Sequence, residues 1–357
     1  MNSVNLSSKQ SKRQEHKLLS TVAFQLLPYS SELRTLWDET ASRCRQNSFL
    51  FRRDFMDYHR DRFPDRSVLF VNQKGRGIAL FPACIVGNDV TQVVSHGGLT
   101  YGGLLLTTEV GAAMAGALFD ALLCHYAAAG FNSLLVKPAP AIYHTAPAEE
   151  EKYWLFRHGA QLVSCGVSSA IDLTAPLPFS TLRRRKVRHA EARGTFSLSS
   201  DLNLLPAFWN MLAEGLWKHH AKRPVHSLEE LTLLTERFPE EIRLFCVCDG
   251  TDDASAVPVA GTLLFYTRNV IHAQYIASTD EGRAGAALDF LFDRLLHTDA
   301  GNFPASARFF DFGISTEGDG SFLNEGLVFQ KEGFGARTVC YEHFLLTLPS
   351  DSLCFKP

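Results

Sequence analysis

The sequence predicts an α/β protein with two mixed-sheet domains in tandem, and three observations support this fold class. The chain has 357 residues, which is more than one hydrophobic core usually serves. Helical and strand-like patterns alternate along it, as they do in mixed sheets flanked by helices. The first half reads helix, meander of strands, long helix, strand, short helix and strand, and the second half repeats this order. An internal duplication of about 170 residues is the simplest explanation of the repeat.

The elements of the first half follow from apolar periodicity and from Gly and Pro punctuation. Residues 24–63 are expected to be helical, because apolar side chains such as Leu33 and Leu36 recur at helical spacing. The further elements expected are strands at 67–73 and 78–86, a strand-rich stretch at 89–106, a helix at 111–129, a strand at 131–137, a helix at 149–158 and one or two strands at 161–173. Segment 112–130 approaches the length of a membrane span, but polar residues such as Asp120 interrupt it. A buried amphipathic helix is the better interpretation.

The second half opens on the most basic segment of the chain, 180–193, which has a helical pattern and stops at Gly194. The elements expected after it are helix 205–219, strand 242–248, a turn at 250–253, strands 257–266 and 270–277, helix 286–296, strand 307–312, a short helix at 322–332 and strand 338–347. We therefore expect a loose polar tail at 1–20, a first domain at 21–178 and a second at 179–357, with 180–193 as a basic linker helix.

Composition and charge limit the functional classes. Apolar residues make up 46% and charged residues 20%, which excludes wholesale disorder. The net charge of -3 gives no general attraction to DNA or to an anionic membrane. The eight cysteines are scattered and the close pair, Cys246 and Cys248, lacks zinc-ligand spacing, so buried reduced thiols and no metal site are expected. The first 17 residues have no apolar core, so we expect no secretory signal, a cytoplasmic location and no stable membrane insertion.

The stretch 271–287 carries a candidate binding site. It reads as a strand, a turn rich in Gly and Ala that contains Arg283, and the start of a helix. Backbone N–H groups and the helix dipole favour an anion at such a helix start. A plain connection between a strand and a helix explains the same pattern, so both interpretations stay open.

Three local patterns in the second half resemble a known family. The first is 184–194, R-R-K-V-R-H-A-E-A-R-G, and the second is 309–313, F-F-D-F-G. The third is 323–335, L-N-E-G-L-V-F-Q-K-E-G-F-G, in which Gln330 separates Phe329 from Lys331. They are similar to stretches of the FemAB group, whose members have two domains of the GNAT acyltransferase fold in tandem. The matches span 184–335, and the first half is assigned by its place in the tandem.

The resemblance implies an N-acyltransferase. It would transfer an acyl group, most simply acetyl from acetyl-coenzyme A, to an amine of a small metabolite, an amino sugar or a cell-envelope precursor. The coenzyme A pyrophosphate would lie against the turn, where glycines admit a phosphate and an arginine binds it. The turn consists of Gly282, Arg283, Ala284, Gly285 and Ala286. Asp280 and Glu281 depart from the family's pattern, because carboxylates repel a pyrophosphate.

Acyl transfer to an amine requires a group that takes the amine proton and groups that hold the oxyanion. His272, Tyr275, Asp311 and Glu317 are candidates, since they lie on or near strands that flank the turn. Strand alternation places His272 and Gln274 on one face and Tyr275 on the other. Structural roles explain these residues equally: a packed strand histidine, or an aspartate that caps a turn.

The resemblance adds Lys331, which matches a lysine thought to hold the donor or the transition state. A solvated lysine at a helix end is the alternative. Arg184 and Arg188, four residues apart on one helix face, suit a phosphate or carboxylate of the substrate, unless 180–193 is a plain solvated linker. Gln274 and Glu317 complete the candidates for substrate binding.

Two other functions stay open. The donor could be an aminoacyl-tRNA, as in the FemAB transferases that build peptidoglycan cross-bridges, although one basic helix in a protein of net charge -3 makes a poor tRNA surface. Alternatively, the chain could be a non-catalytic binding module that retains the fold. The sequence contains no phosphate-binding G-x-x-x-x-G-K loop, no G-x-S-x-G elbow and no H-E-x-x-H zinc motif.

Overall fold

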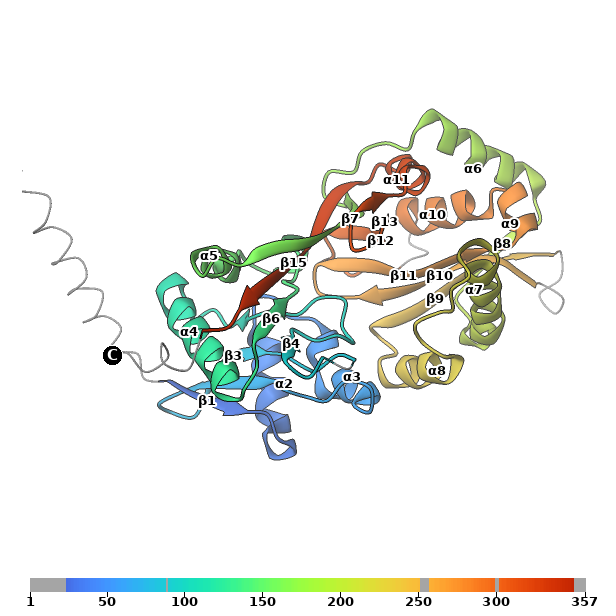
Figure 1. The fold of residues 1–357 in the computed structure, drawn as a ribbon. Helices are drawn as coiled ribbons and strands as arrows, with labels where there is room; N and C mark the ends of the chain where they lie inside the picture. The colour runs from blue at the N-terminus through green and yellow to red at the C-terminus, as the bar shows by residue number, and fades with distance from the viewer. Residues whose placement is uncertain (1–23, 88, 251–256, 299–301, 350–357) are drawn as a thin grey trace, which may run out of the picture. The chain divides into compact units, whose positions relative to one another are not determined.

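The computed structural model describes residues 24–87, 89–250, 257–298 and 302–349, so the expected tail at 1–20 and most of the turn at 250–253 lie outside it. The chain divides into two compact units (Figure 1). Unit 1 comprises Met1–Val163 and Glu342–Pro357, and unit 2 comprises Ser164–Tyr341. The chain thus returns to unit 1 from Glu342 onward, within its last strand, whereas the sequence assigns everything after residue 178 to the second domain.

Unit 1 begins with a strand and not with the expected helix. Strand β1 (Phe24–Pro28) pairs antiparallel with β2 (Val68–Asn72), from Phe24 opposite Asn72 to Pro28 opposite Val68. The pairing with a distant strand overrides the local helical pattern at the start of the segment. An α-helix forms only in α2 (Arg34–Arg43) and in α3 (Arg53–Met56), and the residues between them form none. The sheet continues with β3 (Gly77–Phe81) and β5 (Leu105–Leu106) in the order β1-β2-β3-β5.

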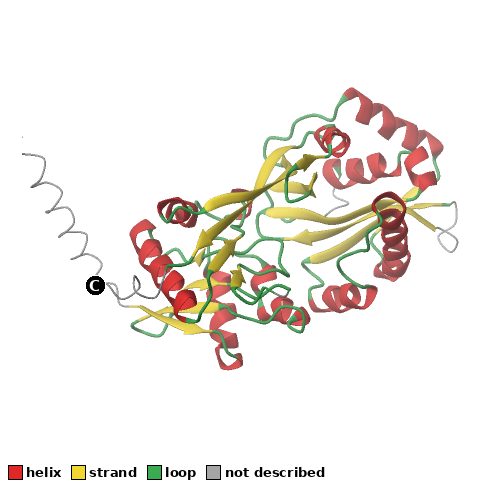
Figure 2. Ribbon diagram, in the orientation of Figure 1, coloured by secondary structure: helices red, strands yellow, loops and turns green. Residues whose placement is uncertain are grey.

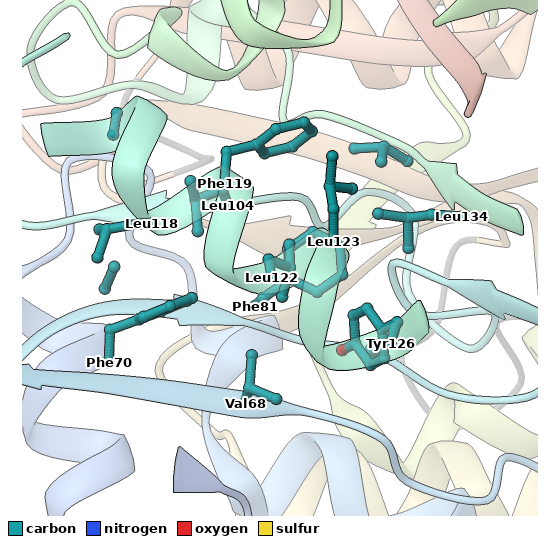
Figure 3. Packing of buried hydrophobic residues seen from close by; sticks show 14 of the residues in the cluster. Val68, Phe70, Phe81, Leu104, Leu118, Phe119, Leu122, Leu123, Tyr126 and Leu134 are labelled. Carbon is teal, nitrogen blue, oxygen red and sulfur yellow. The ribbon is translucent and has the colours of Figure 1, made fainter. Parts of the chain in front are cut away.

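The core of unit 1 explains the long apolar helix. Helix α4 (Ala112–Ala128) buries Leu118, Phe119 and Leu122 completely, together with Phe70 and Phe81 of the sheet (Figure 3). No helix among the described residues is long and apolar enough to cross a membrane. The remaining elements of unit 1 are the short α3 (Arg53–Met56), α5 (Glu150–Arg157) and the parallel strands β4 (Gln92–Val94) and β6 (Ser133–Val136).

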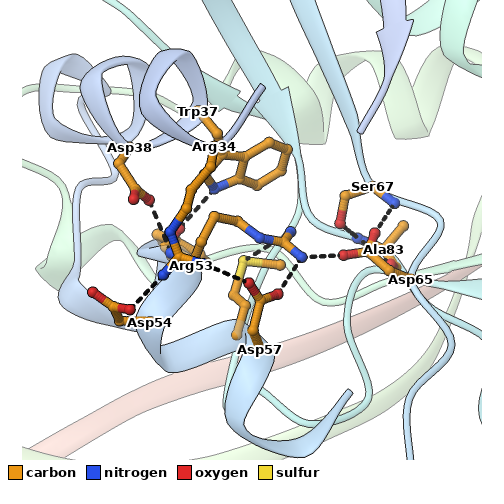
Figure 4. Close-up of polar contacts among 11 residues, drawn as sticks. Arg34, Trp37, Asp38, Arg53, Asp54, Asp57, Asp65, Ser67 and Ala83 are labelled. Carbon is orange, nitrogen blue, oxygen red and sulfur yellow. Dashed lines mark hydrogen bonds and ion pairs between the residues drawn. The ribbon is translucent and has the colours of Figure 1, made fainter. Parts of the chain in front are cut away.

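A buried arginine of α3, Arg53, links this helix to the segment that precedes β2. Arg53 is 2% exposed and forms ion pairs with Asp57 (2.5 Å) and with Asp65 (Figure 4). Its guanidinium also lies 3.6 Å from the ring centroid of Tyr29. Burial lowers the pKa of Arg53, but the carboxylates of Asp65 and Asp57 outweigh this and raise it. Because two carboxylates pair with its charge, Arg53 can be buried without leaving an isolated cation in the interior.

Unit 2 is a mixed sheet with helices on both faces (Figure 2). Its strands are β7 (Gln161–Asp172), β12 (Phe309–Ile314), β11 (Val270–Ser278), β10 (Val257–Tyr266), β9 (Ile242–Asp249) and β8 (Phe196–Ser199), in that order. Its main helices are α6 (Thr181–Arg193), α7 (Leu205–His220), α8 (Leu228–Arg237), α10 (Ala287–His297) and α11 (Glu325–Glu332). Helices α6 and α10 pack together on one face, and α7 packs on β10 and β11.

Most of the expected elements of unit 2 are present. Helix α6 ends at Gly194, which adopts the left-handed conformation (φ 67°) that ends helices. Strand β8 and helix α8 have no counterpart in the sequence-based expectations, and the expected helix at 322–332 starts with a short strand, β14 (Phe322–Leu323). That strand pairs with β13 (Thr316–Glu317), because the turn between them brings Leu323 opposite Thr316.

The cysteines fit the expectation of buried thiols only in part. Four of the described cysteines, Cys44, Cys84, Cys246 and Cys248, are free and buried. Cys124 and Cys165 are half-buried. Cys340, on the last strand, β15 (Arg337–Thr347), is exposed.

Candidate active site

A pocket lies where two parallel strands of unit 2 separate. Strands β11 and β12 are paired from Val270–Phe309 to His272–Asp311. Beyond that point a pocket of about 310 Å³ is lined by residues of both strands and of the surrounding helices. The lining residues are Met211, Leu212, Gly215, Leu216, Ile276, Ala277, Ser278, Arg283, Leu288, Phe292, Phe312, Leu327, Gln330, Lys331 and Phe334. Crevices at the carboxyl ends of parallel strands are frequent ligand sites, because helix N-termini converge there.

The turn before α10 is a short helix. Residues Asp280–Ala284 form α9, and the side chain of Thr279 caps it by accepting a hydrogen bond from the Gly282 N–H (3.0 Å). Gly285 and the left-handed Ala286 (φ 61°) then lead into α10, whose N-terminus has no side-chain cap. Among the five residues of the expected phosphate turn, only Arg283 lines the pocket.

The two glycines of the turn have packing roles. A Cβ on Gly282 would lie 2.1 Å from the carbonyl oxygen of Val259, and a Cβ on Gly285 would lie 2.7 Å from the ring of Phe196. The backbone at Gly282 therefore approaches the Val259 backbone too closely for a side chain, and the backbone at Gly285 lies against a side chain.

Gly282→Ala is expected to lower the free energy of unfolding by about 1–3 kcal/mol or more, because the methyl group meets backbone that cannot move aside. Chemical denaturation would measure this. Gly285→Ala is the matched control with a smaller expected loss, since a flexible ring can shift. Equal losses for the two variants would contradict this explanation.

Asp280 is paired with two cations, so it is not the unpaired carboxylate that would repel a bound anion. Its carboxylate forms ion pairs with Lys218 (2.5 Å) and Arg283 (2.8 Å). The hydrogen bonds from Lys218 and then Arg283 lower the pKa of Asp280 to about 2. The sequence could not show the pair with Lys218, which lies 62 residues away. Glu281 is exposed.

Lys331 is buried at the pocket, which excludes the solvated helix-end alternative. Its Nζ donates hydrogen bonds to the carbonyl oxygens of Gly313 (2.7 Å) and Ile314 (3.2 Å) and to the hydroxyl of Ser315 (2.8 Å). These acceptors use its three N–H groups. Burial lowers the pKa of Lys331 to about 8, and the negative charge of Asp311 partly opposes that effect. Lys331 therefore places a cation at the pocket and fixes the end of β12.

Asp311 is the centre of a buried polar cluster next to Lys331. Its carboxylate is fully buried and accepts hydrogen bonds from Ser168, from Tyr341 (2.6 Å) and from Nδ1 of His272 (3.1 Å). Burial raises the pKa of Asp311, but the hydrogen bonds from these side chains and the charge of His272 outweigh it, and the pKa falls to about 2. A carboxylate that holds an imidazole in this way fixes its ring orientation.

One residue, Gly313, connects the side chains of Asp311 and Lys331. The N–H of Gly313 donates to Asp311 (3.0 Å), and its carbonyl accepts from Lys331. Sequence reasoning missed Ser168 and Tyr341, which come from β7 and β15 and are 143 and 30 residues from Asp311. Nothing in the local patterns indicates such distant partners.

A β-bulge changes which residues share a face of β11. Leu263 lies opposite Tyr275 and Leu264 opposite Ala273, so Gln274 is an extra residue in the strand. His272 and Tyr275 consequently lie on the same face, and the alternation expected from the sequence is wrong here. The hydroxyl of Tyr275 lies 2.6 Å from Nδ1 of His226, and burial raises the pKa of Tyr275 to about 12.

The other predicted site residues lie outside the pocket lining. Glu317 is exposed on β13, and Arg184 and Arg188 are exposed on α6. The arginine of α6 that points inward is Arg183, which forms a buried ion pair with Asp289 (2.8 Å). His272, Gln274, Tyr275 and Asp311 do not line the pocket either. Among the described residues, no group of three or more His, Cys, Asp or Glu side chains is arranged to hold a metal ion.

Comparisons with known proteins identify the fold class. Residues 181–319 match the family model described as an acetyltransferase (GNAT) domain. No curated protein matches the sequence. The second half of the chain therefore contains a GNAT domain, as the sequence predicts.

Solved structures share the fold of nearly the whole chain. The crystal structure of FemX shares 12% identity with it and has a TM-score of 0.65, covering 92% of this chain and 98% of FemX. The C-terminal domain of a putative lysylphosphatidylglycerol synthetase from Agrobacterium fabrum shares 13% identity (TM-score 0.54, 91% and 93% covered). L-PGS from Bacillus licheniformis also shares 13% identity (TM-score 0.54, 89% and 92% covered). At such low identity these likenesses concern the fold alone.

Proposed function

We propose that this protein is an N-acyltransferase that transfers an acyl group, most simply acetyl, from an acyl-coenzyme A to a primary amine. The acceptor would be a small metabolite, an amino sugar or a cell-envelope precursor. The observation that carries the proposal is the pocket between β11 and β12, which combines two cations, Arg283 and Lys331, with apolar walls. A ligand with an anionic end and a long, weakly polar arm suits such a lining.

The residues present fit an acyl-coenzyme A in two respects. The N-terminus of α10 has no side-chain cap, and Leu288 in its first turn lines the pocket, so backbone N–H groups are available to a phosphate. Arg283 supplies a guanidinium beside it, although a phosphate would share this cation with Asp280. Acyl-coenzyme A would supply the thioester, which the amine attacks.

The proposed reaction moves the acyl group from the sulfur of the thioester to the nitrogen of the amine. The amine nitrogen forms a bond to the thioester carbonyl carbon, the C–S bond breaks, and the amine loses a proton while the thiolate takes one up. We assign the role of proton acceptor to His272, which Asp311 holds outside the pocket lining. The positive charge of Lys331 stabilises the negative charge of the tetrahedral intermediate. Tyr275, Gln274 and Glu317 would contact the acceptor.

Arg283→Ala is expected to weaken coenzyme A binding about tenfold or more, because a charge-assisted hydrogen bond to phosphate contributes about 1.5–3 kcal/mol. Isothermal titration with coenzyme A and acetyl-coenzyme A would measure it. Arg223→Ala is the matched control, an exposed arginine outside the pocket lining. The absence of binding at millimolar coenzyme A would refute the acyl-coenzyme A donor.

A second candidate is an aminoacyl-tRNA-dependent transferase, which the similarity of fold to FemX favours. Retained amine acylation with a charged tRNA, and none with acyl-coenzyme A, would select it. A third is a non-catalytic binding module, because Arg283 is already paired with Asp280. Ligand binding without turnover of any amine would support that reading.

A further inference from the structure

The outer face of α6 carries a group of arginines with no acidic partner in the described part of the chain. Arg184, Arg185 and Arg188 are exposed, and none of them forms an ion pair with another described residue. The arginines at the margins of this face are paired: Arg183 with Asp289 at 2.8 Å and Arg193 with Asp249 at 2.9 Å. We call Arg184, Arg185 and Arg188 the basic face.

The basic face is unfavourable for the helix itself. Like charges four residues apart, such as Arg184 and Arg188, destabilise a helix by a few tenths of a kcal/mol. The opposite side of α6 already anchors it, since Val187 and Ala190 are buried in the core of unit 2. The arginines are therefore unnecessary for packing, and an anionic partner would relieve their mutual repulsion.

A second group of exposed apolar side chains comes from the end of β12, from β14 and from α11. We call it the apolar tip. Its members are exposed and come from a stretch of 16 residues in the chain. They are Ile314 (49% exposed), Phe322 (61%), Leu323 (42%) and Phe329 (65%). Exposed apolar groups that lie together mark a contact surface more often than scattered ones do.

The helices that carry the two surfaces, α6 and α11, adjoin in unit 2. The Ser180 N–H at the start of α6 donates to the carbonyl of Gly333 at the end of α11 (2.8 Å). The guanidinium of Arg183 lies 5.0 Å from the ring centroid of Phe334. Leu177, 45% exposed, precedes α6 in the chain, and its backbone packs against Gly335, which follows α11. Figure 1 shows α6 and α11 in the same part of unit 2.

We propose that the basic face and the apolar tip together dock unit 2 on the surface of an anionic lipid bilayer. Arginines bind lipid phosphates and are attracted by the surface charge, and Phe and Leu side chains enter the boundary between headgroups and acyl chains. RNA would explain the arginines but not the aliphatic groups, because Ile314 and Leu323 cannot stack on bases. The inference does not depend on the proposed acyl transfer. It would bring the pocket near the bilayer, since α11 carries Phe329 outward and Leu327 and Lys331 in the pocket lining.

The test is co-sedimentation of the full chain with vesicles. We expect binding to phosphatidylcholine vesicles that contain phosphatidylglycerol, weakening as salt rises, and little binding to phosphatidylcholine alone. Each arginine near an anionic surface is worth about fivefold in the partition constant. The triple variant R184Q/R185Q/R188Q should therefore bind about 100-fold more weakly, and F329S about tenfold more weakly.

Helix α5 of unit 1 offers matched controls. Phe156 is 78% exposed and Arg157 beside it is exposed, and neither belongs to either surface. F156S and R157Q should bind vesicles like the unchanged protein, and thermal unfolding verifies that every variant is folded. Equal loss in controls and test variants, no binding to anionic vesicles, or salt-sensitive binding of RNA without vesicle binding would each overturn the proposal.

Discussion

Asp311→Ala is expected to lower the free energy of unfolding by about 3–5 kcal/mol, the usual effect of removing one member of a buried charge pair. The carboxylate is fully buried and accepts hydrogen bonds from Ser168, Tyr341, His272 and the Gly313 N–H. Alanine would leave these donors without their acceptor in a place that water does not reach. Chemical denaturation at pH 7, followed by circular dichroism, measures the loss.

Asp293→Ala is the matched control, because Asp293 also pairs with a histidine, His297 (2.9 Å), but at the surface of α10. Exposed pairs of this kind contribute about 0–1 kcal/mol. Similar losses for the two variants would contradict the special role of Asp311.

The pH dependence of this effect has a definite sign. The pKa of Asp311 is about 2 in the folded protein and near 3.8 in an ordinary environment. A carboxyl group with a lowered pKa stabilises the fold above the ordinary pKa and loses that contribution as pH falls through the folded value. The difference between the unchanged protein and Asp311→Ala should therefore shrink between about pH 4 and pH 2.

The sequence predicted the elements whose signals are local. Helix α4 has a continuous apolar pattern, and α6 ends at a glycine that the helix end requires, so both lie within about two residues of the expected bounds. The tandem fold followed from the order of such elements. Strand β1 was missed because its identity depends on pairing with β2, more than 40 residues further along the chain.

The sequence predicted the residues of the site better than it predicted their arrangement. Sequence reasoning found Lys331, Asp311 and Arg283, but the partners that set their chemistry come from distant segments. Ser168 and Tyr341 hold Asp311, and Lys218 pairs with Asp280. The bulge at Gln274 depends on the register with β10, which periodicity along one strand cannot reveal.

Lys331→Met is expected to lower kcat/KM for amine acylation by about 10²–10³-fold, the size of effect seen when a group that stabilises an oxyanion is removed. Lys331 uses its N–H groups on Gly313, Ile314 and Ser315, so it acts through its charge and through the peptide that it positions. Acylation assays with a panel of small amines, at saturating and limiting acyl donor, would separate kcat from KM.

A pH profile distinguishes the charge from the positioning role. Because the pKa of Lys331 is about 8, the cation is lost as pH rises through that value, and activity should fall with it. Lys331→Arg keeps a positive charge in this range, so it should retain part of the activity and lose the alkaline decline. Gln330→Ala, a neighbouring change in the pocket lining, should leave the profile in place.

Stability supplies a readout that does not require turnover. The pKa of Lys331 is lowered from 10.5 to about 8, so between these values the unfolded chain binds a proton that the folded protein has released. The contribution of this residue to stability therefore rises with pH across that range, by about 3 kcal/mol in total, and Lys331→Met should lack the rise. If the unchanged protein and Lys331→Met show the same slope of stability against pH from 8 to 10.5, the pKa of Lys331 is ordinary. That result would contradict the role of Lys331 in the proposed mechanism.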